Sequence, residues 1–262
     1  MKELAEQIDE KSQQSEEQVV NNVESLLASV VLILNDNSKE KTYTLQDGSK
    51  INKDVVNRGR LRTILFELRK LERETESFIY DGVLSSIEVA VLSTVSFYKN
   101  RFDAIVTKGE LSPKKLVDES DDSGYSLKDR ASTTSISYTD DLYKRIRQSL
   151  NKGHTVSQTI NEVKKTFDGK AWELRRIVTT ETFNAYRKQV GEIASRNSLT
   201  WIKIRESFPR HPRRKRHECF NYAHEDKYGM GDGVFKLTDA KIYYPHPQCT
   251  SWLELIELTR EV

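Results

Sequence analysis

The sequence predicts a mainly α-helical protein with elongated N-terminal helices, a short hairpin and a small C-terminal α+β module. Before Trp201, apolar residues recur mostly at steps of three and four, which is the helical period. After Trp201 the pattern changes to the alternation typical of strands. Charged residues make up 31% of the 262 positions and apolar residues 36%, against averages of about 25% and 45–50% with glycine counted. We therefore expect long helices around a thin core that relies on partners for burial.

The N-terminal half is predicted to be helical with one hairpin. Residues 1–18 carry six acids against two lysines, so a solvated helix or a disordered arm is expected. Residues 19–34 have apolar positions at helical spacing. Thr42–Leu45 followed by Asp47-Gly48 predicts a strand entering a turn, because Asp-Gly readily adopts positive φ. Two long helices follow, with a break expected at Asp81-Gly82.

A linker is predicted near the middle of the chain. Residues 116–126 contain four acids, a glycine and several serines, a composition typical of a flexible acidic segment. This linker would divide the protein into a helical N-terminal region, residues 1–115, and a C-terminal region, residues 127–262.

The C-terminal half is predicted to contain helices followed by short strands. Thr155 and Gln158 form a capping-box pair that starts one helix, and another is expected over residues 170–197. Alternation over residues 201–205 predicts a strand, and residues 234–237 and 242–244 are further strand candidates.

Cysteine content and hydropathy favour synthesis in a reducing cytoplasm. Two cysteines in a chain of this length do not form a disulfide framework. The N-terminus lacks the apolar core of a signal sequence. The longest aliphatic stretch, Leu26 to Leu34, falls well short of the roughly 20 apolar residues that a membrane helix needs.

A basic cluster is the densest charge feature. Trp201 to His217 contains seven Lys or Arg against one acid, a local net charge of +6 in a chain whose net charge is +2. Such a cluster binds a polyphosphate by releasing condensed counterions, and its place on a loop favours contacts with DNA phosphates over base reading. A solvated surface loop, or a docking patch for an acidic protein, is an equal alternative. The DNA-binding candidates are Arg210, Arg213, Arg214, Lys215 and Arg216.

A candidate metal site follows the basic cluster. Cys219 and His224 have the spacing Cys-x4-His, and His246 and Cys249 have the spacing His-x2-Cys. Two cysteines and two histidines would suit one tetrahedral zinc ion. The spacing is looser than the common Cys-x2-Cys pair, and Cys249 would also fit as a small core residue.

The same region allows a second hypothesis, a metal-dependent nuclease. Such an enzyme needs a general base, a bound metal and a phosphate clamp, and His217, His224, His246 and Asp232 lie near the arginines in sequence. No tight motif specifies this site.

A polar set lies on the predicted helix 170–197. Arg176, Thr180 and Asn184 are four residues apart and share one helix face, and Glu181 is beside them. No nucleophile or base accompanies them. We therefore expect a buried polar network that fixes this helix on the C-terminal module.

Several pieces of the second half occur in a distinctive order between about Tyr125 and Leu258. The most specific is the ending, Tyr244-Pro245-His246-Pro247-Gln248-Cys249. The preceding pieces are Asp129-Arg130 before the helix with Leu142–Leu150, the helix start Gly153–Ser157, the helix Arg175–Ala185 with its Thr180-Glu181 core, the strand from Trp201, and the segment Cys219–His224. In this order they resemble the Mu F-like family of phage minor head proteins, also called head morphogenesis proteins.

The chain departs from the family pattern in two respects. Many family members have a Cys-x2-Cys pair and end in His-Pro-x-Cys-x-Cys, whereas this chain has Tyr222 and Ser251 at the second cysteine positions. A four-cysteine zinc site is therefore excluded, and a single zinc would have to recruit His224 and His246. The basic insertion at residues 210–217 is also longer than the connection usual in the family.

The resemblance implies a minor capsid protein of a tailed bacteriophage, present in few copies inside the head and without enzymatic activity. It implies association with the portal protein and other head proteins, contact with packaged double-stranded DNA, and a role in head assembly and in DNA packaging or ejection. The expected location is the capsid interior of the virion, after assembly in the host cytoplasm, with no membrane in the assembled head.

Residues 1–115 would anchor the protein on the portal or inner shell, because apolar helix faces need partners. Two rival functions remain. One is the metal-dependent nuclease, acting on phage or host DNA, and the other is a cytoplasmic regulatory or toxin-like adaptor that is absent from virions.

Overall fold

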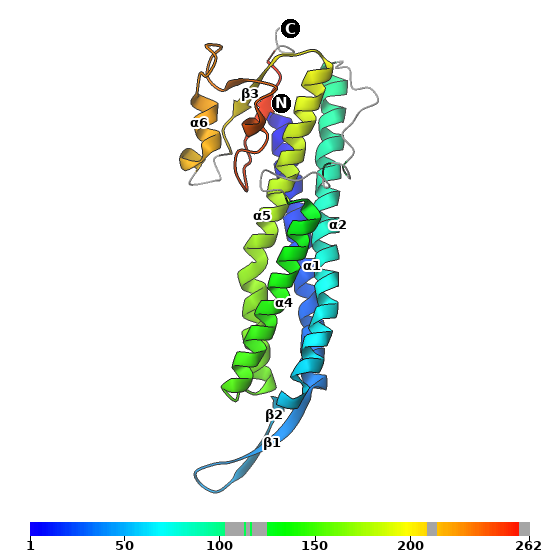
Figure 1. The fold of residues 1–262 in the computed structure, drawn as a ribbon, viewed down its shortest axis with the longest axis vertical. Helices are drawn as coiled ribbons and strands as arrows, with labels where there is room; N and C mark the ends of the chain where they lie inside the picture. Colours follow the sequence, from blue (N-terminus) through cyan, green and yellow to red (C-terminus); the bar gives the residue numbers. More distant parts are fainter. Residues whose placement is uncertain (103–112, 114–115, 117–124, 209–213, 257–262) are drawn as a thin grey trace. The chain divides into compact units, whose positions relative to one another are not determined.

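The computed structural model describes residues 1–102, 113, 116, 125–208 and 214–256. The helices are α1 (Lys2–Asp36), α2 (Leu61–Phe102), α4 (Leu127–Asn151), α5 (Val156–Arg196) and α6 (Glu218–His224). The strands are β1 (Ser38–Thr44), β2 (Lys50–Val56), β3 (Trp201–Arg205), β4 (Val234–Lys236) and β5 (Trp252–Glu254) (Figure 1). The predicted class, mainly α with a small C-terminal α+β region, is confirmed.

The chain divides into two compact units, and the long helices α1, α2 and α5 contribute residues to both. Unit 1 contains Met1–Gln18, Asp81–Leu127 and Leu174–Val262, and unit 2 contains Val19–Tyr80 and Lys128–Glu173. This division differs from the expected one into residues 1–115 and 127–262, because each half of the chain supplies helices to each unit. Of the expected linker 116–126, all but residues 116, 125 and 126 lies outside the described residues.

Unit 2 packs parts of α1, α2, α4 and α5 around an apolar interior. Its buried side chains include Val23, Leu26 and Val30 of α1, Ile64 and Leu68 of α2, Leu142 and Ile146 of α4, and Val163 and Phe167 of α5. The hydroxyl of Tyr138 donates to the Phe167 carbonyl at 3.3 Å, and the two rings meet edge to face with centroids 5.4 Å apart. Helical spacing of apolar residues thus produces the interior that the sequence predicts.

Two helices are longer than predicted. The capping box forms, since the Gln158 N–H donates to the Thr155 hydroxyl at 3.2 Å and the Thr155 N–H donates to the Gln158 side chain at 2.9 Å. The helix that it starts continues through residue 169 to Arg196, so the two predicted helices are one. Helix α2 also passes through Asp81-Gly82 without a break. A glycine inside a helix costs only about 1 kcal/mol relative to alanine, and burial of neighbouring apolar residues offsets this.

The predicted hairpin is confirmed and is longer than expected. Strands β1 and β2 pair antiparallel from Ser38 opposite Val56 to Thr44 opposite Lys50. In the turn, Gly48 has φ of +81°, and the Asp47 carboxylate accepts the Ser49 hydroxyl at 2.6 Å and the Ser49 N–H at 2.9 Å. These two hydrogen bonds lower the pKa of Asp47.

Unit 1 combines parts of α1, α2 and α5 with the C-terminal sheet. The strand order is β4-β3-β5, with antiparallel neighbours. The strand predicted at 201–205 is confirmed. The strand predicted at 242–244 is wrong, because residues 240–242 form the short 3₁₀ helix η3 (Ala240–Ile242), and β5 had not been predicted.

The first turns of α1 belong to the core of unit 1. Leu4, Ala5 and Ile8 are buried in one apolar cluster with Tyr186 of α5 and Ile202 of β3. The expectation of a solvated helix or disordered arm is therefore wrong for this face, although most of the acidic residues are exposed. Three apolar residues among many charged ones are enough to bury this face of the helix, because residues at positions i and i+4 lie on the same side of a helix.

Parts of α1 and of the segment Arg58–Asn100 are long and apolar enough to cross a membrane by length and composition alone. Core helices of soluble proteins pass the same test. In both segments part of the apolar surface is buried within the units.

Gly191 of α5 lies where a side chain has no room. A Cβ there would come within 2.6 Å of the Tyr243 ring, whose hydroxyl donates to the Leu237 carbonyl at 3.0 Å. We predict that Gly191→Ala lowers the free energy of unfolding by about 1–3 kcal/mol, as overpacking does. Gly169 of the same helix has open space at its Cβ position, so Gly169→Ala should instead stabilise by about 0.5–1 kcal/mol. Denaturant unfolding measures both variants, and stabilisation by both would contradict the close packing of Tyr243 on α5.

Candidate metal centre

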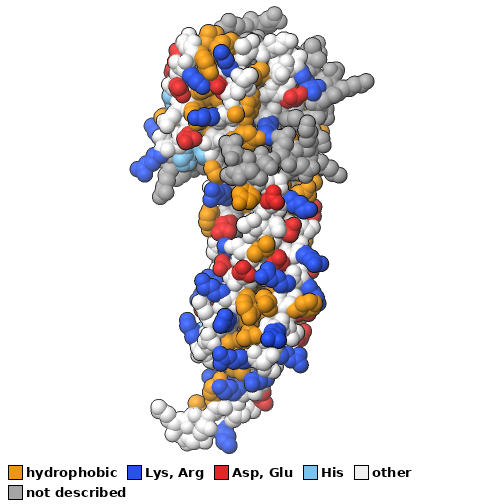
Figure 2. Space-filling view, in the orientation of Figure 1, with side chains coloured by type: hydrophobic (Ala, Val, Ile, Leu, Met, Phe, Trp, Pro, Cys, Tyr) orange, Lys and Arg blue, Asp and Glu red, His pale blue; other side chains and the backbone are white. Residues whose placement is uncertain are grey.

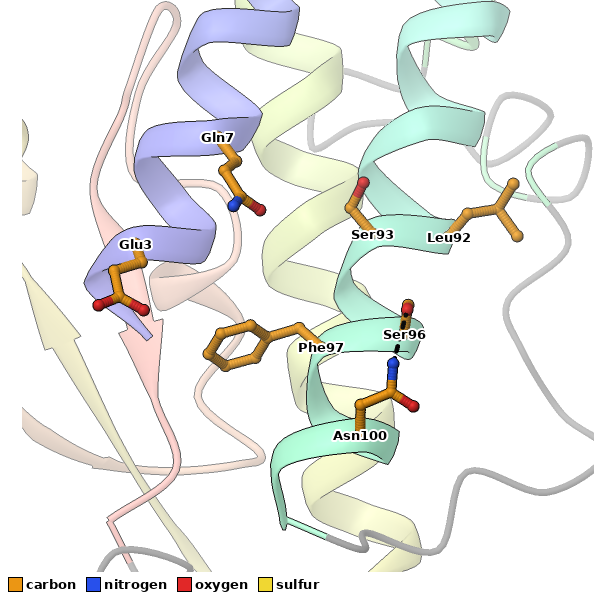
Figure 3. A pocket seen from close by; sticks show the side chains of 7 residues that line it. All are labelled: Glu3, Gln7, Leu92, Ser93, Ser96, Phe97 and Asn100. Carbon is orange, nitrogen blue, oxygen red and sulfur yellow. Dashed lines mark hydrogen bonds between the residues drawn. The ribbon is translucent and has the colours of Figure 1, made fainter.

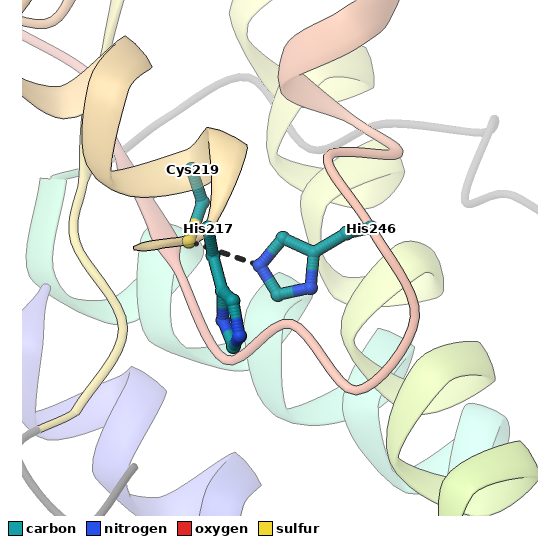
Figure 4. A group of neighbouring side chains, drawn as sticks. All are labelled: His217, Cys219 and His246. Atoms are coloured by element: carbon teal, nitrogen blue, oxygen red, sulfur yellow. Dashed lines mark hydrogen bonds between the residues drawn. The ribbon is translucent and has the colours of Figure 1, made fainter. Parts of the chain in front are cut away.

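The C-terminal module brings both cysteines of the chain close to two of its histidines. His217 precedes α6, Cys219 lies in the first turn of α6, and His246 lies in the loop between η3 and β5. Figure 4 shows that the side chains of these three residues converge from α6 and from this loop. We call this set the His-Cys-His group.

The His-Cys-His group has the geometry of a metal-binding cluster. One donor atom from each side chain lies within 4.8 Å of the other two. The Nε2 atom of His246 is 3.1 Å from the Sγ atom of Cys219, and the ring centroids of His217 and His246 are 4.4 Å apart. Imidazole nitrogen and thiolate sulfur are ligands that zinc and related metals use. The group could therefore bind a metal ion.

A hydrogen bond from the Nδ1 atom of His246 to the main chain leaves its Nε2 atom facing the Cys219 thiol. Nδ1 lies 2.8 Å from the Pro247 carbonyl oxygen. Because a carbonyl only accepts, Nδ1 carries the hydrogen, and in the neutral ring Nε2 has a lone pair directed at Cys219. Metal-binding histidines are commonly oriented by such a bond from the second nitrogen to a backbone carbonyl.

The two thiols are free, buried and surrounded by serine hydroxyls. Oγ of Ser207 is 3.4 Å from Sγ of Cys219 and 3.8 Å from Sγ of Cys249. The Cys249 thiol donates to the Ser251 hydroxyl at 3.0 Å. Cys249 therefore lies next to the His-Cys-His group, within reach of the same serine as Cys219.

The two buried thiols have pKa values that are shifted in opposite directions. Burial raises the pKa of Cys249, but its contacts with Cys219, the Arg187 guanidinium and His246 outweigh burial and hold the pKa well below the usual range. Contact with Cys249 and burial raise the pKa of Cys219 far above its usual range. Burial lowers the pKa of His246, but its contact with Cys249 outweighs this and raises it. Burial and the neighbouring His246 lower the pKa of His217.

Arg187 of α5 fixes the loop that precedes β5. Its side chain is fully buried, and its guanidinium donates to the carbonyls of Tyr243 at 2.9 Å, Cys249 at 3.1 Å and Ser251 at 2.9 Å. A fourth bond, at 2.7 Å, goes to the side-chain oxygen of Asn184. Burial lowers the pKa of Arg187, but the ordinary pKa of arginine is so high that the group stays charged.

Only some residues of the polar set predicted on α5 contact the C-terminal module. The Thr180 hydroxyl accepts the Gln248 N–H at 2.9 Å and donates to the Arg176 carbonyl at 2.6 Å, and Asn184 holds Arg187. The side chain of Glu181 is half-buried, and that of Arg176 is exposed. Thr180 contacts the loop that precedes β5 directly, and Asn184 contacts it through Arg187. The side chain of Arg176 is exposed and does not take part in this network.

The predicted metal set needs one correction. The structure brings Cys219 and His246 together, with Cys249 beside them, but His224 is exposed and its ring lies against Phe220 with centroids 4.3 Å apart. His217 takes its place in the group. The reason is α6, a seven-residue helix that separates His224 at its end from Cys219 in its first turn. In the described part of the chain, the group with metal-binding geometry includes no carboxylate, so Asp232 of the nuclease hypothesis is not part of it.

Three residues of the site were not predicted, namely Arg187, Ser207 and Ser251. Arg187 had a usable signal, because it lies on the apolar stripe of α5 with Phe183 and Val190, at positions where a solvated arginine is not expected. The two serines have no comparable signal in the sequence.

The basic cluster is described only in part. Arg210 and Arg213 lie outside the described residues, and Arg214 begins the short helix η2 (Arg214–Arg216). Lys215 and Arg216 are exposed and lead directly into His217. On the face drawn in Figure 2, Lys and Arg side chains alternate with Asp and Glu and do not gather into one large patch.

A groove of 690 Å³ also lies in unit 1, between α1 and α2 (Figure 3). It is lined by Glu3, Gln7, Leu92, Ser93, Ser96, Phe97 and Asn100. Of these lining residues only Glu3 is titratable, so the groove offers no pair of groups for acid–base chemistry.

Comparisons of the chain with protein-family models, curated proteins and solved structures find no match. The resemblance to the Mu F-like family therefore rests on the sequence motifs. Three of those motifs, around Thr180, Cys219 and His246, are in contact with one another through this site.

Replacing Arg187 should destabilise the protein severely. Arg187→Met would leave the buried carbonyls of Cys249 and Ser251 and the half-buried carbonyl of Tyr243 without their donor, and each unsatisfied buried group costs about 1–3 kcal/mol. We predict a loss of about 3 kcal/mol or more in the free energy of unfolding. Arg176→Met, on the exposed face of the same helix, should change it by about 0.5 kcal/mol or less. Urea unfolding of both variants checks this, and equally small losses would show that Arg187 does not hold the loop.

Proposed function

We propose that this protein is a minor capsid protein of a tailed bacteriophage, with a structural role inside the head and no catalytic activity. The observation that supports this most strongly is that motifs far apart in the sequence hold one another in place. The ending Tyr244–Cys249 is bound by Thr180 and Arg187 of α5 and by Cys219 of α6. These contacts explain why the motifs around Thr180, Cys219 and His246 would occur together in one structural module.

We propose zinc as the ion that the His-Cys-His group binds. Two imidazoles and a thiolate suit zinc, whereas Mg²⁺ prefers oxygen ligands. The metal-dependent nuclease remains the alternative function, since zinc with an open ligand position can activate water.

The proposed partners are the portal protein, other head proteins and packaged double-stranded DNA. Large apolar side chains exposed on α1 and α2 support protein partners, with Leu32 62% exposed, Phe66 61% and Leu92 58%. Residues 1–18 supply Leu4 and Ile8 to the core of unit 1. Anchoring is therefore better tested by surface substitutions than by deleting residues 1–115.

Quantitative mass spectrometry of purified virions tests the proposed location. We expect the protein at a few copies per particle, within the capsid, and its loss after triggered DNA release would identify it as a protein ejected with the genome. Its absence from virions, together with a soluble pool in infected cells, would contradict the proposal and favour the adaptor or the nuclease.

DNA binding tests the role of the basic cluster. Replacing Arg210, Arg213, Arg214, Lys215 and Arg216 with Ser should weaken binding to all sequences alike, because phosphate contacts carry no base information. The slope of log affinity against log salt should fall by about 0.9 for each lost phosphate contact. Replacing the exposed hairpin residues Lys39, Lys41, Lys50 and Lys53 with Ser is the matched control and should change binding little.

Fluorescence anisotropy over a salt series measures both variants. Unchanged binding by the cluster variant would show that this segment contacts protein instead of DNA. Metal-dependent nicking of a plasmid that His246→Ala abolishes would favour the nuclease.

A further inference from the structure

The His-Cys-His group could supply three ligands to a metal ion, and the buried Cys249 thiol lies beside it, near the same serine as Cys219. The Cys249 thiol is free and buried, like that of Cys219. It also shares Ser207 with Cys219, at 3.8 Å and 3.4 Å respectively. Structural zinc sites are almost always closed by four protein ligands.

We propose that His217, Cys219, His246 and Cys249 together form one closed zinc site. The set has two thiolates and two imidazoles, so its two negative charges balance the ion. It differs from the set expected from the sequence in one ligand, His217 in place of His224. The site rests on the proposed zinc but not on the role in a phage head, so the two proposals can fail separately.

Closing the site requires the Cys249 side chain to turn toward the His-Cys-His group. The Cys249 sulfur lies outside the three-atom group and donates to the Ser251 hydroxyl at 3.0 Å. Its main chain is already fixed, because the Cys249 carbonyl accepts a hydrogen bond from Arg187 at 3.1 Å. Rotation of the side chain would therefore exchange the bond to Ser251 for a bond to the ion while the loop stays in place.

Groups that orient zinc ligands are also present. The Pro247 carbonyl holds Nδ1 of His246 at 2.8 Å, leaving Nε2 for the ion. The Ser207 hydroxyl lies within reach of both sulfurs and can donate to a thiolate. Such outer contacts fix ligand orientation and raise metal affinity.

A closed site would act as a cross-link and not as a catalyst. It would join the segment at the start of α6 to the loop before β5, and it would leave no coordination position for water. This is the feature that separates the proposal from the nuclease, which needs zinc with an open position.

Zinc content and X-ray absorption of the full-length protein test the proposal without any substitution. We expect one zinc per chain, with two sulfur neighbours at about 2.3 Å and two nitrogen neighbours at about 2.0–2.1 Å. A chain that binds no zinc when the metal is supplied, or a bound zinc with a single sulfur neighbour, would overturn the four-ligand site.

Substitutions identify the ligands. In Cys249→Ser, zinc affinity should fall by more than the roughly 10–100-fold that loss of an outer contact causes. The thiolate-to-metal absorption of the cobalt-substituted protein should fall to about half, because one of two thiolates is lost. His224→Ala is the matched control and should bind zinc like the parent. Wild-type affinity in Cys249→Ser would exclude Cys249, and if that variant fails to fold by circular dichroism, the sulfur count of the parent protein decides.

Discussion

The buried guanidinium of Arg187 is the interaction on which the C-terminal module depends. Burying a charge costs several kcal/mol unless its donors are satisfied, and here they bind three main-chain carbonyls and the Asn184 side chain. Because Arg187 holds the carbonyls of this loop, the side chains of His246 and Cys249 are free to meet Cys219 and Ser207. The candidate metal centre therefore exists because α5 fixes the backbone around it.

The site combines features that suit a structural cross-link. Both thiols are buried, the His246 ring is oriented by a backbone carbonyl, and serine hydroxyls contact the two sulfurs. The donor atoms of the group face one another, and the exposed residues Lys215 and Arg216 directly precede His217 in the sequence.

The sequence correctly predicted those elements that are stabilised by interactions between residues close together in the chain. The hairpin at Asp47-Gly48 and the Thr155–Gln158 capping box formed because their hydrogen bonds involve near neighbours. The predicted break at Asp81-Gly82 was wrong because burial outweighs the small helical penalty of glycine. The buried face of residues 1–18, strand β5 and the replacement of His224 by His217 depend on contacts distant in sequence, which periodicity and spacing do not reveal. Spacing correctly indicated that Cys219 and His246 could meet, and the structure brings their side chains together.

The N–H of Leu255 donates to the sulfur of Met1 at 3.3 Å, and Leu4 and Ile8 share a core with Leu253. The start of α1 thus shares a core with residues that follow it by most of the length of the chain. Contacts of such long sequence separation form slowly, because the intervening chain must first be brought together. The apolar face at the start of α1 is therefore covered only once the C-terminal strands are in place.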